Sequence, residues 1–160
     1  MTVYFLRDRI LGTVILHTRF GTVCGTDYTK MNNSILLIDD DPDDHDIFEF
    51  ALEMAYPKAT CEHSFNCQDA VNKIKDRLFP LPDNIFLDFN MPKMELPKCL
   101  FAINEALGVN HVDIVILTGL KVSDLPNYQS FGVMKVISKP STIELLAGEI
   151  KDVMGYKASA

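Results

Sequence analysis

The sequence predicts an α/β fold built on a doubly wound parallel sheet. Two observations carry this prediction: short apolar runs alternate with amphipathic segments from residue 34 onward, and chemically reactive polar residues stand at the ends of several runs. Short apolar runs bounded by turn residues are typical of buried parallel strands, which require crossover helices between them. With 160 residues, 48% apolar and 23% charged, the chain has the size and composition of one globular domain.

The first strand-and-helix unit follows residue 33. Residues 34–39 form an apolar strand that ends in aspartates. Asp41 and Pro42 then open a helix, because Asp favours the N-cap and Pro the first helical position. The Tyr56-Pro57 pair ends this helix. Apolar residues at helical spacing predict its buried face: Ile47, Phe50, Ala51 and Met54.

Four further units complete the pattern. We predict strands at 59–65, 84–88, 112–118 and 132–138. Asn66 caps a second helix, a third covers 97–107, a polar helix covers 122–130, and the capping-box residues Ser141 and Glu144 open the last. The second helix is predicted to bury Val71, Ile74 and Leu78, and the last to bury Ile143, Leu146, Ala147, Ile150 and Met154. Five βα repeats with right-handed crossovers give a (βα)5 three-layer sandwich, with the flavodoxin-like strand order 2-1-3-4-5.

Reactive side chains stand at the carboxyl ends of four predicted strands. Asp39 and Asp40 end the first, Asp88 the third, Thr118 the fourth, and Lys139 follows the fifth. These ends are neighbours in a 2-1-3-4-5 sheet, so the side chains should meet at one edge. Clustered carboxylates raise each other's pKa or bind a cation, and an all-oxygen site suits Mg²⁺ or Ca²⁺.

An ordinary helix start is the alternative explanation of the acidic run. Asp is common at helix caps and first turns, which accounts for Asp41, Asp43 and Asp44. It accounts poorly for Asp39 and Asp40, because they belong to the strand end. We therefore assign a functional role to that pair.

Four runs at these strand ends, in this order, resemble a response regulator receiver domain. The resemblance covers about residues 33–154. The runs are Ile35-Leu-Leu-Ile-Asp39-Asp40-Asp41-Pro42, Ile85-Phe-Leu-Asp88-Phe-Asn90-Met91-Pro92-Lys-Met94, Val115-Ile-Leu-Thr118-Gly119 and Ser138-Lys139-Pro140.

The resemblance implies a role for each site residue. Asp88 matches the phosphoacceptor, and Asp39 and Asp40 match the acid pair that binds Mg²⁺ together with Asp88 and the backbone carbonyl of Asn90. Thr118 matches a hydroxyl that bonds a phosphoryl oxygen, and Lys139 matches the lysine that contacts the phosphoryl group. The Lys139-Pro140 bond looks like the family's cis peptide, which only an X-Pro bond makes cheap.

The implied function is that of a phosphoacceptor in a two-component phosphorelay. We expect a histidine kinase or phosphotransfer protein as donor, Mg²⁺ as cofactor, and a downstream protein as target. We expect a stand-alone receiver that is not an enzyme, because the chain ends six residues after Met154. One alternative is a Mg²⁺-dependent phosphohydrolase, although such enzymes carry an acid where this chain has Asn90. The other is a receiver-like module that binds its partner without phosphorylation.

Three residues depart from the family pattern. Leu96 and Pro97 stand where Gly and an apolar residue are usual, so the loop after Asp88 should be reshaped. Val136 stands where an aromatic ring commonly swings inward, so the output step should be altered. Gly119 keeps the small residue that leaves room for phosphate.

Composition and charge restrict the partners and the compartment. A net charge of −7 and the lack of a basic aromatic stripe argue against nucleic acid. No uncharged apolar stretch approaches the roughly 18 residues of a membrane span. The four cysteines lack zinc spacing and are interpreted as buried thiols in a reducing compartment, which indicates the cytoplasm. We interpret the four histidines as surface or packing residues: His17, His45, His63 and His111.

The first thirty residues differ from the remainder. They carry a net charge of +2, against −9 for the rest of the chain. We expect 1–32 to be an extension outside the fold, with translation starting at Met31, a receiver domain over 33–154, and a tail over 155–160. The competing idea is that 3–6 and 10–16 form an extra strand or helix that covers a sheet edge. Arginines before 10–16 also give a signal-peptide outline, but the cleavage pattern is poor.

Overall fold

The computed structural model describes residues 5–7, 13–18, 21–26, 33–91 and 94–155. The chain divides into two compact units, Met1–Asn32 and Asn33–Ala160, and each has its own sheet. In the smaller unit, β1 (Phe5–Arg7), β2 (Thr13–Thr18) and β3 (Gly21–Thr26) form an antiparallel sheet in the order β1-β2-β3. The start at Met31 lies outside the described residues, so that boundary stays a prediction.

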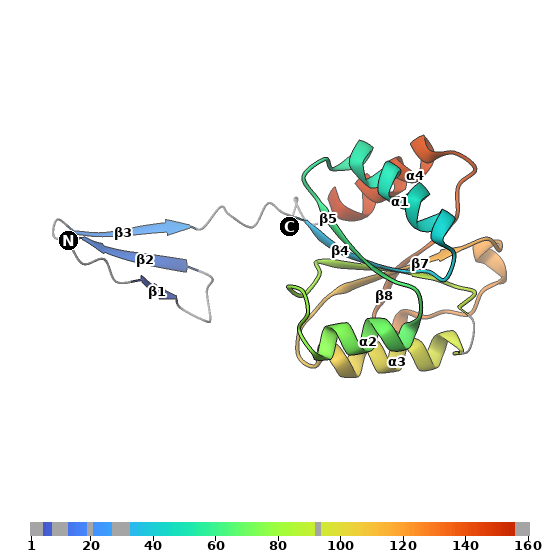
Figure 1. Ribbon diagram of the computed structural model, residues 1–160, viewed down its shortest axis with the longest axis horizontal. Helices are drawn as coiled ribbons and strands as arrows, with labels where there is room; N and C mark the ends of the chain where they lie inside the picture. Colours follow the sequence, from blue (N-terminus) through green and yellow to red (C-terminus); the bar gives the residue numbers. More distant parts are fainter. Residues whose placement is uncertain (1–4, 8–12, 19–20, 27–32, 92–93, 156–160) are drawn as a thin grey trace. The chain divides into compact units, whose positions relative to one another are not determined.

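The larger unit contains the predicted five-stranded parallel sheet (Figure 1). Its strands are β4 (Ser34–Ile38), β5 (Thr60–Ser64), β6 (Asn84–Asp88), β7 (Asp113–Thr118) and β8 (Val133–Ser138). They lie in the order β5-β4-β6-β7-β8, and every neighbouring pair is parallel. Counted within this unit the order is 2-1-3-4-5, which confirms the predicted topology.

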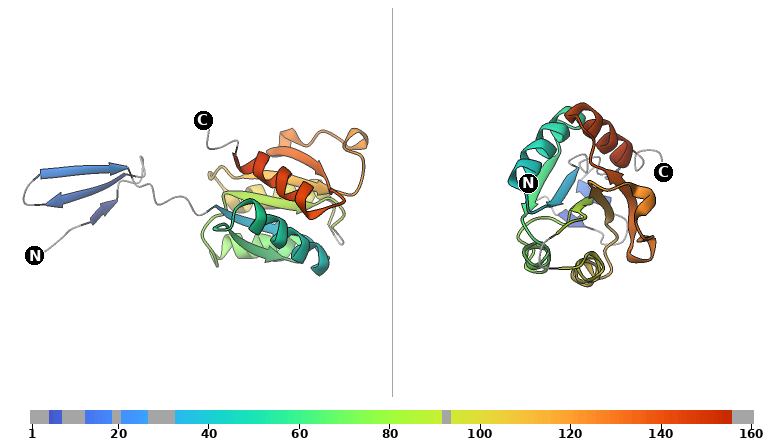
Figure 2. Two further views of the ribbon diagram at one scale, coloured as in Figure 1. Left: turned by 90° about the horizontal axis from the view of Figure 1, so that it is seen from above. Right: turned by 90° about the vertical axis from the view of Figure 1, so that its right-hand side faces the viewer.

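Helices cover both faces of this sheet and make three layers (Figures 1 and 2). Helices α1 (Pro42–Ala55) and α4 (Ile143–Gly155) lie on one face, and α2 (Cys67–Lys75) and α3 (Leu96–Leu107) lie on the other. None of the helices that the structure describes has the length and apolar character needed to cross a membrane.

Two apolar cores fill the spaces between the layers. Strand β4 supplies both, because its side chains alternate: Ile35 and Leu37 point toward α1 and α4, whereas Leu36 and Ile38 point toward α2 and α3. All four are at most 1% exposed. Burying each such side chain stabilises the fold by about 1.5–3 kcal/mol. This burial on both faces explains why β4 is continuously apolar from Ile35 to Ile38.

Helix α1 begins as predicted but buries a different face. The side chain of Asp41 caps it by accepting from the Asp43 N–H, and Pro42 is its first residue. The predicted burial of Ile47, Phe50 and Met54 is wrong, since all three are exposed. The buried residues are His45, Phe48, Ala51 and Leu52. Both sets have helical spacing, and packing of Phe48 on Phe86 from β6, with ring centroids 4.9 Å apart, selects the second.

Two other helix predictions need correction at their ends. The side chain of Asn66 caps α2 as predicted, but the helix ends at Lys75 and Arg77 takes a φ of 51°. The chain therefore turns before Leu78, which is 69% exposed instead of buried. In α4 the cap is Thr142, whose Oγ1 accepts from the Leu145 N–H at 3.3 Å, so the predicted Ser141–Glu144 box does not form.

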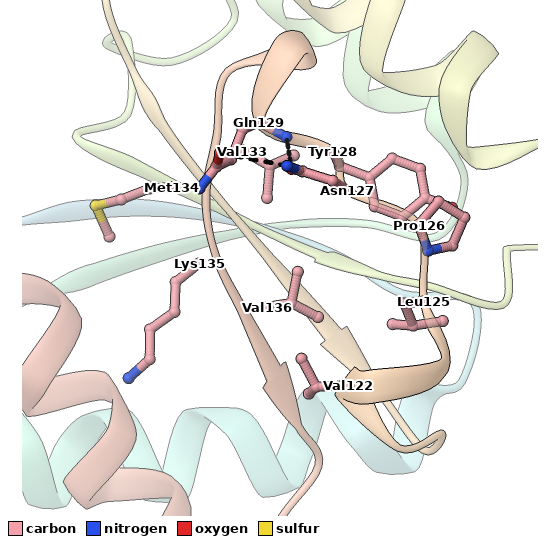
Figure 3. A pocket seen from close by; sticks show the side chains of 10 residues that line it. All are labelled: Val122, Leu125, Pro126, Asn127, Tyr128, Gln129, Val133, Met134, Lys135 and Val136. Carbon is pink, nitrogen blue, oxygen red and sulfur yellow. Dashed lines mark hydrogen bonds between the residues drawn. The ribbon is translucent and has the colours of Figure 1, made fainter.

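The predicted polar helix over 122–130 is wrong. Two single-turn 3-10 helices, Val122–Asp124 and Gln129–Phe131, replace it. Leu125 is extended, with φ −95° and ψ 147°, because the ring of Pro126 disfavours a helical conformation in the preceding residue. The side chains of this connection and of β8 line a hollow of about 260 Å³ (Figure 3).

Two of the cysteines form a disulfide, contrary to the prediction of free thiols. Cys67 begins α2, Cys99 lies in α3, and their Cα atoms are 5.8 Å apart. Both are buried as expected, but they face each other across the contact between the two helices. Cys61 in β5 is free and partly buried, and burial raises the pKa of its thiol to about 12.

Candidate functional site

The end of β4 presents one buried and one exposed carboxylate. Asp39 is 2% exposed, whereas Asp40 lies at the surface. The Asp39 N–H donates to the carbonyl of Ser64 in β5 at 3.1 Å, and its Oδ1 accepts from the Asp41 N–H at 3.0 Å. The start of the helix thus holds the Asp39 side chain in place.

The end of β6 presents Asp88, which is 5% exposed. Its Oδ2 accepts from the Asn90 N–H at 2.6 Å. The next residue, Phe89, donates its N–H to the Leu117 carbonyl of β7 at 2.8 Å, which keeps the strand end in register. Asp88 therefore has one oxygen engaged by its own loop and the other directed to the side chains around it.

The predicted acidic residues come together. One carboxylate oxygen from each of Asp39, Asp40 and Asp88 lies within 4.8 Å of the other two. Burial raises the pKa of Asp39 above its ordinary value, against the opposing effects of the Asp41 N–H and Lys139. An oxygen-only, highly charged cluster of this kind matches the ligands that Mg²⁺ prefers.

Lys139 joins the cluster from the end of β8. Its Nζ lies 2.9 Å from Asp39 Oδ2, 2.7 Å from Asp88 Oδ1 and 2.5 Å from Asp44 Oδ2. Burial opposes the charge on this amine, yet the hydrogen bonds to the three carboxylates raise the pKa of Lys139 above its usual value. The ammonium is therefore held charged at the centre of the acids.

The predicted cis bond between Lys139 and Pro140 is wrong, because this bond is trans. The lysine reaches the acids without it. The backbone N–H of Lys139 donates to the Thr118 carbonyl at 2.6 Å. This bond continues the pairing of β8 with β7 and directs the chain toward the site.

Thr118 ends β7 fully buried. Its Oγ1 accepts from the Leu120 N–H at 3.0 Å, so its own O–H proton remains to be donated elsewhere. Asp88 pairs with Leu117 in the sheet, which places Thr118 one residue beyond that pair at the same edge.

Sequence reasoning missed two contributors. The sequence explains Asp44 as an acid of the first helical turn, but in the structure it also binds Lys139. The available signal was its position on the first turn after the acid pair. His45 was treated as a packing residue, but its Nε2 lies 2.8 Å from the Asp39 carbonyl oxygen. The signal for this contact would have been the position of His45 on the buried face of α1. The sequence pattern assigned that face to other residues.

The departures from the family pattern have clear places in the structure. Leu96 begins α3 and is buried in the core between the sheet and α2 and α3, so it anchors the helix where Gly is usual. Pro97 is exposed at the second position of that helix. Val136 is half-buried in β8 and lines the hollow beside Val122 and Leu125 (Figure 3).

Comparison with known families agrees with this geometry. The family model of the response regulator receiver domain matches residues 35–151. The chain belongs to this family. The match covers more than half of the chain and includes every predicted site residue. No curated protein matches in sequence.

Solved receivers share the fold at low sequence identity. The phosphorylated cyanobacterial phytochrome response regulator RcpA is 18% identical, with a TM-score of 0.64 over 78% of this chain and 93% of that one. The CheY-like receiver domain protein of Methanospirillum hungatei JF-1 is 19% identical, with a TM-score of 0.63 over 80% and 98%. The Mn²⁺-bound response regulator Rcp1 is 19% identical, with a TM-score of 0.63 over 78% and 93%.

Proposed function

We propose that this receiver takes a phosphoryl group on Asp88, with Mg²⁺ as cofactor, and signals by binding a protein partner. One observation carries the proposal: side chains from the ends of β4, β6 and β8 converge on the buried Asp88, which Lys139 contacts at 2.7 Å. The donor would be a histidine kinase or phosphotransfer protein, since receivers take phosphate from such proteins. We also propose the cytoplasm as the compartment, on the ground that the donor is a histidine kinase or phosphotransfer protein; the Cys67–Cys99 disulfide removes the argument from free thiols.

The transfer is a displacement at phosphorus. A carboxylate oxygen of Asp88 attacks, the bond from phosphorus to the donor atom breaks, and the leaving group keeps the electron pair. The product is an aspartyl phosphate. A carboxylate is a weak nucleophile, so catalysis rests on alignment and on neutralising charge at the phosphoryl oxygens. Lys139 would supply one positive charge, and the free hydroxyl proton of Thr118 one hydrogen bond.

The residues present fit a divalent cation. Asp39, Asp40 and Asp88 supply carboxylate oxygens within reach of one another, and the Asn90 carbonyl would add a neutral one. Bound Mg²⁺ would offset negative charge on the acids and on the incoming phosphoryl group. Three acids already contact Lys139, so that single ammonium leaves most of their charge unbalanced.

Intact-mass spectrometry of the full chain tests the proposal. Incubation with acetyl phosphate and Mg²⁺ should add one phosphoryl group, and EDTA or Asp88→Asn should abolish the gain. Asp46→Asn, which changes an exposed acid of α1, is the matched control and should label normally. Unchanged labelling of Asp88→Asn would refute the assignment.

The same experiment separates the alternatives. A phosphohydrolase would release phosphate continuously with many turnovers, whereas a receiver retains the group and loses it slowly. A receiver-like module that no longer accepts phosphate would show no mass gain at all. Asn90, which stands where a hydrolase needs an acid, supports the receiver assignment.

We also propose that residues 1–32 lie outside the receiver domain and that Met31 is the start of translation. Every strand of the receiver sheet lies beyond residue 33. A chain that starts at Met31 should fold and label like the full chain. A melting temperature several degrees lower would instead show that apolar surface had been uncovered, at a cost of about 25 cal/mol per Å².

A further inference from the structure

A histidine relay connects the edge of the receiver sheet to the acid pair. Its members are His45 and Glu49 on α1 and His63 on the edge strand β5. His45 Nδ1 lies 2.5 Å from His63 Nδ1, and His63 Nε2 lies 2.6 Å from Glu49 Oε1. At its other end, His45 Nε2 lies 2.8 Å from the carbonyl oxygen of Asp39.

The direction of the two outer hydrogen bonds follows from their acceptors. A carbonyl oxygen only accepts, so His45 Nε2 donates to Asp39. A carboxylate also only accepts, so His63 Nε2 donates to Glu49. Between the rings, one Nδ1 donates to the other. The relay thus offers the Asp39 carbonyl an N–H donor from a ring that is itself held by the edge strand.

The relay is packed rather than loose. His45 is 4% exposed, and its ring contacts those of His63 and Phe65, with centroid distances of 4.7 and 4.5 Å. Lys73 of α2 donates to the His63 carbonyl at 2.6 Å, which fixes the backbone of the edge strand from the other face. This packing restricts the orientation in which the His45 ring approaches the Asp39 carbonyl.

The carbonyl that His45 contacts belongs to the peptide bond between Asp39 and Asp40. A peptide unit is planar, so a hydrogen bond to its oxygen also fixes the direction of the Asp40 N–H. The same bond restricts the ψ angle of Asp39 and the φ angle of Asp40. The Asp39 N–H is already held by the Ser64 carbonyl of β5. The relay therefore controls the remaining freedom that sets how the two carboxylates face each other.

We propose that His45 and His63 are positioning residues that orient the acid pair and so set its affinity for Mg²⁺ and the rate of phosphorylation. This inference rests on the proposed function of Asp39 and Asp40 as metal ligands. Removing groups that orient ligands commonly lowers metal affinity by about 10–100-fold. It also makes the exposed rim of β5 and α1, where Glu49 stands, a surface that is coupled to the site.

The test is Mg²⁺ binding by calorimetry on the full chain, with melting temperature as a separate readout. His45→Phe keeps a ring of similar size but donates no hydrogen bond, and should weaken Mg²⁺ binding by about tenfold. His45→Gln restores a donor and should recover most of the affinity. His111→Phe changes a histidine that is 94% exposed and is the matched control, with no expected effect.

His63→Leu is the second variant, and it keeps the proposal falsifiable if His45→Phe fails to fold. His63→Leu removes no negative charge, so on charge alone it would not weaken binding of a cation. A weaker affinity in His63→Leu would therefore report lost orientation.

Two results would contradict the account, and they differ. Wild type that binds Mg²⁺, with variants that melt lower but bind it equally well, would overturn the relay alone. Wild type that binds no Mg²⁺ and accepts no phosphoryl group would overturn the proposed function and the relay with it.

Discussion

The acid cluster and the connection between β7 and β8 are adjacent in the chain but differ in how their structure is determined. Thr118 ends β7 within the site, and the connection begins immediately after it. In the cluster, Asp39, Asp88 and Thr118 stand at the ends of strands that have parallel neighbours on both sides, and Lys139 follows the edge strand β8. In the connection, two single-turn helices are separated by residues 125–128, the first of which is extended. Strand topology therefore determines the first region, and local turn chemistry the second.

This difference explains why the predicted acid cluster forms while the predicted helix beside it does not. The sequence pattern predicts a polar helix over 122–130, between β7 and β8. The structure instead has a hollow lined by Val122, Leu125 and Val136 (Figure 3). We expect phosphorylation to change this face only modestly, since Val136 cannot act as a swinging ring.

The largest expected effect is at Lys139. Lys139→Met leaves the carboxylates of Asp39, Asp44 and Asp88 facing one another without their ammonium. The free energy of unfolding, measured in EDTA, should fall by about 3 kcal/mol, because removing one partner of a buried ion pair leaves uncompensated charge. Labelling by acetyl phosphate should slow about a hundredfold, as for the loss of one charge-stabilising donor. Urea denaturation and labelling kinetics measure the two effects.

Lys135→Met is the matched control for this variant. Lys135 pairs with Glu149 at 2.7 Å, but both side chains are well exposed, at 40% and 37%. The loss of such a pair should cost less than about 1 kcal/mol and leave labelling unchanged. Equal effects of the two lysine variants would remove the distinction between the cluster and the rest of the surface.

The acid pair should make stability depend on Mg²⁺. At a Mg²⁺ concentration a hundred times the dissociation constant, the wild-type chain should gain about 2.7 kcal/mol by mass action. A chain with both Asp39→Asn and Asp40→Asn should gain little. Thermal unfolding with Mg²⁺ and with EDTA measures the gain, and an equal shift in both proteins would show that the pair is not the metal site.

Alkaline pH should weaken the cluster. The three carboxylates raise the pKa of Lys139, so the folded chain keeps this proton to higher pH than the unfolded chain. The contribution of the charged Lys139 to the free energy of unfolding is complete below the ordinary lysine pKa of 10.5. It is lost as the pH rises through the higher pKa that Lys139 has in the folded chain. Stability measured by urea should therefore fall more steeply above that pH in wild type than in Lys139→Met. Parallel curves would contradict a charged, clustered lysine.

The smallest expected effect is in the connection. Pro126→Ala removes the ring that keeps Leu125 extended, so helix should extend toward Tyr128. Far-UV circular dichroism should show added helix, with stability changed by no more than about 0.5 kcal/mol because Pro126 is exposed. An unchanged spectrum would mean that contacts of the connection, and not the proline, set its shape.

The same contrast shows what could be predicted from the sequence. Asp39, Asp88, Thr118 and Lys139 were placed correctly because strand order alone brings their positions to one edge. The buried face of α1 was not, because Phe48 and Phe50 both fit a helical period and only the tertiary contact with Phe86 decides between them. The contact of His45 with Asp39 depends on that face and could not be found before the face was known, whereas the position of Asp44 on the first turn after the acid pair was an available signal.

The central claim is that Asp88 itself carries the phosphoryl group. The most direct measurement is peptide mapping of the labelled wild-type chain after borohydride, which reduces an acyl phosphate to an alcohol and so marks the acceptor permanently. The account predicts one modified residue, Asp88, and only in samples labelled with Mg²⁺ present. A mark on Asp39, Asp40 or Asp44, or the same mark at Asp88 in EDTA, would contradict it.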